Sequence, residues 1–118
     1  MNEKEVQQTI LAHENRNSAL LKLFLERNID TRAPRDIDLH FWVSGEAGAT
    51  ALAESLSRSG FQVPVQRPTP SQDHSDLWNV EARIRQSIDL TIRREFISDV
   101  VRLADSHGGV FDGWGTLL

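Results

Sequence analysis

The chain has 118 residues, of which 39% are hydrophobic and 25% charged, an ordinary composition for one globular domain with a modest core. The formal net charge of −4 disfavours a general binder of the nucleic-acid backbone, and the lack of cysteine excludes disulfides, thiolate catalysis and cysteine-based zinc sites. The N-terminus has no signal-peptide pattern and no apolar run could span a bilayer, so we expect a cytoplasmic protein with no membrane contact.

The first 27 residues predict a helix. Over 3–27, apolar residues recur at three- and four-residue spacing, and the stripe consists of Val6, Ile10, Leu20, Leu21 and Phe24. The run 13–17 is polar all round, so the segment is either one long helix or two short ones. Asn28 marks the expected stop, and Pro34 excludes helix before the next element.

A strand, a short helix and a second strand are expected next. Residues 36–43 alternate, and the apolar face of this predicted strand consists of Ile37, Leu39, Phe41 and Val43. Ser44 could cap an alanine-rich helix over 46–59, with Leu52 and Leu56 on its inner face. Residues 61–66 alternate again, and Pro64 cannot donate a ladder hydrogen bond, which predicts a strand at a sheet edge.

After an expected polar, mobile loop over 67–76, the alternation of residues 77–86 predicts a third strand. Its apolar face consists of Trp78, Val80, Ala82 and Ile84. Residues 89–107 predict a helix whose inward stripe consists of Ile92, Phe96, Val100, Leu103 and Ala104. Two glycines stop this helix, and residues 110–114 are expected to be a fourth strand.

This order predicts an α+β protein with a ferredoxin-like βαββαβ fold, a four-stranded antiparallel sheet and an extra N-terminal helix. Connection rules place the first and third strands in the centre of the sheet and the second and fourth at its edges. We expect residues 1–30 to form the N-terminal helix and residues 31–118 the ferredoxin-like domain.

The outward side chains of three neighbouring strands form a candidate surface. Strand alternation places these residues on the sheet face opposite the helices: His40, Trp42, Glu81, Arg83, Asp112 and Trp114. One interpretation is that the N-terminal helix lies across this face and buries the tryptophans. The other is that the face docks a protein partner, because tryptophan and arginine are favoured at the centres of interfaces.

Three segments together carry a family resemblance. They are PRDIDLHFW from residue 34, SGF at 59–61 and HGGVFDGWGT at 107–116. With these motifs the chain resembles the ribonuclease E inhibitor family, RraB, over about residues 30–116. The resemblance implies a non-catalytic, cofactor-free regulator that binds the endoribonuclease initiating bacterial messenger RNA decay, through the C-terminal part of that enzyme, and lowers its activity.

The sequence also bears on other classes of function. A metal site is disfavoured because the four histidines show no ligand spacing, and RNA binding is disfavoured because the third strand has no aromatic residue on the candidate face. An alternative is a small-molecule-sensing or dimerisation domain with no ribonuclease target. An enzyme using His40 and Asp112 as a base and its orienting carboxylate would need a deep cleft around them. The sequence leaves open whether the protein is a monomer or a homodimer.

Overall fold

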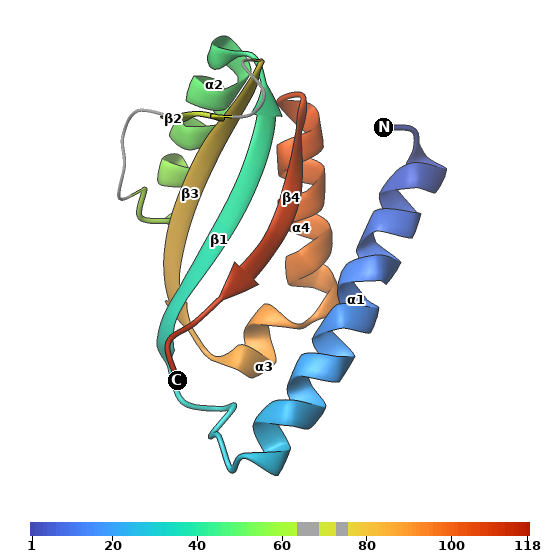
Figure 1. Ribbon diagram of the computed structural model, residues 1–118, viewed down its shortest axis with the longest axis vertical. Helices are drawn as coiled ribbons and strands as arrows, with labels where there is room; N and C mark the ends of the chain where they lie inside the picture. Colours follow the sequence, from blue (N-terminus) through green and yellow to red (C-terminus); the bar gives the residue numbers. More distant parts are fainter. Residues whose placement is uncertain (64–68, 73–75) are drawn as a thin grey trace.

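The structure is a computed structural model that describes residues 1–63, 69–72 and 76–118. Its elements, in chain order, are α1 (Glu3–Glu26), β1 (Arg35–Ser44), α2 (Glu46–Arg58), β2 (Thr69–Pro70), β3 (Leu77–Gln86), α3 (Ile88–Thr91), α4 (Arg94–Ser106) and β4 (Gly109–Gly115) (Figure 1). The strands form one antiparallel sheet in the order β2-β3-β1-β4. The predicted α+β class and the central position of the first and third strands are confirmed.

The core lies between the sheet and the helices α2 and α4, which cover one of its faces (Figure 1). The four apolar residues expected on the inner face of β1 are fully buried. Leu52 and Leu56 of α2 are fully buried against them, as predicted. The expected cap of α2 was wrong, because Gly45 is the N-cap and Ser44 is the last residue of β1.

Helix α1 is continuous and lies beside α4 and β4, so it does not cover the other face of the sheet (Figure 1). Asn2 caps its start, accepting from the backbone N–H of Glu5, whose carboxylate accepts from the backbone N–H of Asn2 in return. Val6, Ile10 and Phe24 are buried as the stripe predicted. The polar run 13–17 does not break the helix, because three of its side chains, His13, Arg16 and Asn17, form hydrogen bonds with β4.

The helix expected over 89–107 is divided in two. Ser87 caps the short helix α3, its hydroxyl accepting from the backbone N–H of Leu90, and the chain leaves helical geometry at residues 92–93 before α4 begins. Because of this break, the residues of α4 that face the core differ in part from the predicted ones. The buried residues of α4 are Ile97, Val100, Val101 and Ala104, whereas Ile92, Phe96 and Leu103 are half-buried.

The segment between α2 and β3 differs most from the prediction. Within the expected strand over 61–66, Gln62 makes an isolated bridge to Arg83, and residues 64–66 lie outside the described residues. Within the expected loop, Thr69 and Pro70 form the edge strand, pairing with Asn79 and Trp78, whereas residues 67, 68 and 73–75 lie outside the described ones. The edge strand β2 therefore contains a proline, which is Pro70, whereas the expected Pro64 lies outside the described residues.

Candidate functional site

The sheet face opposite the helices, here called the open face, carries a ladder of paired polar side chains from its two central strands. The register sets Asp36 against Arg85, Asp38 against Arg83, His40 against Glu81 and Trp42 against Asn79. These eight residues alternate with the buried ones, so local strand geometry alone places them together. The sequence predicted this for His40, Trp42, Glu81 and Arg83, and their shared face is confirmed.

The ladder changes its electrostatic character along its length. Arg83 Nε donates to Asp38 Oδ1 at 2.7 Å, and Arg85 Nη1 to Asp36 Oδ1 at 3.3 Å, so two arginines and two aspartates neutralise each other. The hydrogen bond to Asp38, and then the charge of Asp38, raise the pKa of Arg83 above its ordinary value. The third pair is different, because it combines a carboxylate with a histidine.

His40 Nδ1 lies 3.5 Å from Glu81 Oε1, and the two side chains are 42% and 46% exposed. A histidine supplies a full positive charge only when it is protonated, so Glu81 lacks the permanent cation that each aspartate of the ladder has. Next along the strands, Trp42 is half-buried and lines a hollow of about 300 Å³ together with Asn79, Glu81 and residues 69–72. This end of the open face therefore combines an aromatic ring with a carboxylate.

Trp114 does not lie on the open face, and its predicted placement was wrong. The register between β1 and β4 shifts between His40 and Phe41, so Trp114 lies opposite the inward-facing Leu39. A bulge adds one residue to a strand and so reverses the face of every residue beyond it. Trp114 is 8% exposed, and its ring lies 6.3 Å from that of Phe24 in α1.

The bulge also moves Asp112. His40 lies opposite Gly113, so Asp112 is not its direct cross-strand neighbour, as the prediction of a base and an orienting carboxylate had required. Asp112 is exposed, at the side of β4 where Arg16 of α1 donates to its backbone carbonyl at 3.3 Å. The carboxylate next to His40 is Glu81, and Asp112 belongs to the rim of the sheet.

Three polar residues of α1 that the prediction did not single out hold β4 in place. His13 Nε2 donates to the carbonyl of Phe111 at 3.0 Å, and burial, the largest effect, lowers the pKa of His13. Asn17, 3% exposed, accepts from the indole N–H of Trp114 at 2.9 Å. With Arg16, these side chains satisfy backbone and indole groups of an edge strand. The signal in the sequence was the polar run 13–17 within an amphipathic helix.

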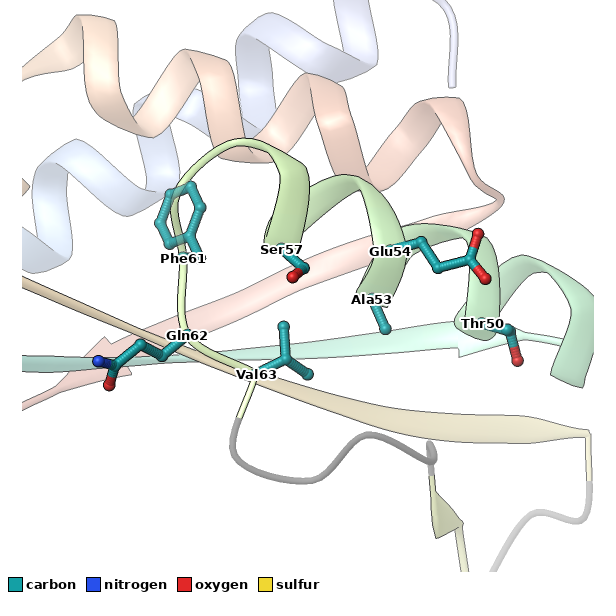
Figure 2. Close-up of a pocket in the computed structure, with 7 residues that line it drawn as sticks. All are labelled: Thr50, Ala53, Glu54, Ser57, Phe61, Gln62 and Val63. Carbon is teal, nitrogen blue, oxygen red and sulfur yellow. The ribbon is translucent and has the colours of Figure 1, made fainter.

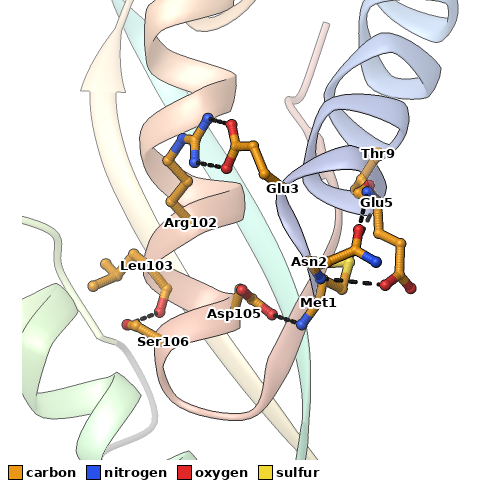
Figure 3. Close-up of polar contacts among 9 residues, drawn as sticks. All are labelled: Met1, Asn2, Glu3, Glu5, Thr9, Arg102, Leu103, Asp105 and Ser106. Carbon is orange, nitrogen blue, oxygen red and sulfur yellow. Dashed lines mark hydrogen bonds and ion pairs between the residues drawn. The ribbon is translucent and has the colours of Figure 1, made fainter.

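The start of α1 is joined to the end of α4 by charged groups (Figure 3). Arg102 donates to both carboxylate oxygens of Glu3, at 2.8 and 2.9 Å, and these hydrogen bonds are the main cause that lowers the pKa of Glu3 to about 2. The amino group of Met1 lies 2.8 Å from Asp105 Oδ1, and this hydrogen bond raises the pKa of the amine. These contacts hold α1 against α4, away from the open face.

A further hollow of about 360 Å³ lies between α2 and residues 61–63 (Figure 2). Glu54 is the one ionisable side chain among the seven described residues that line it, so these residues offer no acid–base pair. Among the described residues, no three histidine, aspartate or glutamate side chains are grouped to hold a metal ion. Within the same part of the chain, no helix is both long and apolar enough to cross a membrane.

Comparison with known proteins adds one match. The family model described as RraB, regulator of ribonuclease activity B, matches residues 14–116. This range includes the second half of α1 and all the strands, so it contains the open face and two of the three polar residues that hold β4, Arg16 and Asn17, whereas His13 lies just before it. A search of curated proteins finds none that matches the chain.

Proposed function

The chain belongs to the RraB family of regulators of ribonuclease activity, and from this membership we propose that it is a non-catalytic protein that binds ribonuclease E and lowers its activity. Regulation of a ribonuclease implies a protein partner. The observation that supports direct binding is that α1 packs beside α4, which leaves the central ladder and Trp42 accessible on the open face.

The proposed contact surface consists of His40, Trp42, Glu81 and Arg83, with Asp112 at its rim. Trp42 supplies the aromatic centre that strong interfaces use, and the paired charges around it supply the polar border. Trp114 supports this surface from the core and does not contact the partner. A catalytic role for His40 and Glu81 is disfavoured because both are nearly half exposed, where water screens the charge that a catalytic site must concentrate.

The proposal is tested by a binding and cleavage experiment with purified ribonuclease E. We expect the protein to bind the full-length enzyme, to slow its cleavage of an RNA substrate, and to lose binding when the C-terminal half of the enzyme is removed. Binding of the truncated enzyme with equal affinity would contradict the proposed target region. Failure to bind the full-length enzyme would refute ribonuclease E as the partner.

The surface is tested by two alanine variants of exposed or half-exposed apolar residues. Trp42→Ala should weaken binding by roughly tenfold or more, because it removes the aromatic centre of the surface. Leu11→Ala, at a position that is 54% exposed on α1, should change affinity by less than about twofold. Equal effects of the two substitutions, with circular dichroism spectra unchanged, would show that the open face is not the contact surface.

A further inference from the structure

Trp42 lies at one end of the open face, in register with Asn79 of β3 and Val110 of β4. It lines the hollow of about 300 Å³ towards β2 and a second hollow of about 310 Å³ towards the start of β4. Each hollow is at the small end of the range for ligand pockets, so it suits one long side chain of a partner. The indole is shared by both hollows.

Of the two hollows, the first has a carboxylate without a permanent cation beside it. Glu81 lines the first hollow, and Asp105, paired with the amino group of Met1, lines the second. Among the described residues that line the two hollows there is no lysine or arginine. The arginines of the open face, Arg83 and Arg85, are held by aspartates further along the strands. The hollow between Trp42 and Glu81 is therefore complementary to a cation.

We propose that the hollow between Trp42 and Glu81 receives an arginine side chain from a basic segment of the partner protein. The guanidinium group can stack on an indole face and donate to a carboxylate at the same time, which a lysine ammonium group does less well. The side-chain oxygen of Asn79, on the same hollow wall, offers a further acceptor. This inference rests on the proposed function, since it names the chemistry by which the open face recognises a protein.

A single-stranded RNA could also stack a base on Trp42, but its phosphates would meet the Glu81 carboxylate. The two ligands are distinguished by titrating the full-length, isotope-labelled protein and following the indole N–H resonance of Trp42 by NMR. The probes are an oligoarginine peptide, an oligocitrulline peptide of the same length, and an oligouridine RNA. Citrulline keeps the shape of arginine and removes its charge.

We expect oligoarginine to shift the Trp42 indole resonance and oligocitrulline to bind at least roughly fivefold more weakly. Glu81→Gln should weaken oligoarginine binding by roughly fivefold. The matched control is Asp36→Asn, which removes one negative charge from the same face but beside Arg85, and should change affinity by less than about twofold. Equal effects of the two substitutions, or a shift of Trp42 with oligouridine and not with oligoarginine, would overturn the proposal.

The same variants separate this inference from the proposed function. If ribonuclease E binds the unmodified protein and the Glu81→Gln variant equally well, the arginine site is wrong, whereas the regulator function stands. If oligoarginine binds at Trp42 but ribonuclease E does not bind the protein, the arginine site stands and the basic partner is another protein.

Discussion

Replacing Trp114 by phenylalanine tests whether the bulge in β4 places this residue in the core. The indole N–H donates to Asn17 Oδ1, and Asn17 Nδ2 is already buried without a hydrogen-bond partner among the described residues. Phenylalanine keeps an aromatic ring beside Phe24 but removes the donor. The carboxamide of Asn17 would then be buried with neither of its polar atoms bonded.

The size of the effect follows from these contacts. An unsatisfied buried polar group costs about 1–3 kcal/mol, and the smaller ring leaves a gap that adds about 1 kcal/mol. We therefore expect Trp114→Phe to lower the free energy of unfolding by about 2–4 kcal/mol. With a typical slope of the unfolding free energy against urea concentration, this loss lowers the urea concentration at the denaturation midpoint by roughly 1–3 M.

Urea denaturation followed by far-UV circular dichroism measures the loss, with Trp42→Phe as the matched control. Trp42 is half-buried on the open face, so its replacement should cost less than about 1 kcal/mol. Adding Asn17→Leu to Trp114→Phe should recover part of the stability, because it removes the unpaired carboxamide. Equal losses of unfolding free energy for Trp114→Phe and Trp42→Phe would refute the assignment of Trp114 to the core.

Three further predictions concern the contacts of α1 and β4. Gly113 has φ of +149°, so Gly113→Ala should destabilise the protein by about 1–3 kcal/mol. Gly115→Ala, where no atom lies within 4 Å of the added carbon, should cost less than about 0.5 kcal/mol. Similar losses of thermal stability for the two substitutions would contradict this prediction. Burial keeps His13 neutral in the folded state, so its contribution to stability is complete above pH 6.5, its ordinary pKa, and is lost as pH falls through the lower folded-state value. His13→Gln should therefore weaken the dependence of the free energy of unfolding on pH below pH 6.5, as measured by denaturation. An unchanged dependence on pH would contradict the burial of His13. The pKa of Glu3 falls from 4.5 to about 2 in the fold, so its contribution to stability is present above pH 4.5 and disappears as pH falls towards 2. Glu3→Gln should remove that part of the pH dependence of stability measured by denaturation, and a pH dependence unchanged by the substitution would contradict the contact with Arg102.

The central strands could be predicted closely from the sequence. The expected strands over 36–43 and 77–86 agree within one residue with β1 (Arg35–Ser44) and β3 (Leu77–Gln86). In a strand, successive side chains point to opposite faces, so the pattern of apolar and polar residues fixes both the element and its two faces. That is why His40, Trp42, Glu81 and Arg83 could be grouped before any pairing was known.

The edges and the break between α3 and α4 could not be predicted in this way. Ser87 follows the last residue of β3 and caps α3. A helical periodicity that continues through residues 92–93 conceals the interruption between α3 and α4. The edge strand near Pro70 is only two residues long, too short for alternation to indicate it.

Local periodicity in the sequence was enough to predict β1 and β3 and the side chains that these two strands present on the open face. The tertiary structure decided where α1 packs and on which face Trp114 lies. Both depend on pairing across the chain: the bulge in β4 arises in its register with β1, and it turns Trp114 towards Asn17 of α1. Because α1 packs there, it does not cover the face that carries Trp42, which stays accessible for the proposed partner.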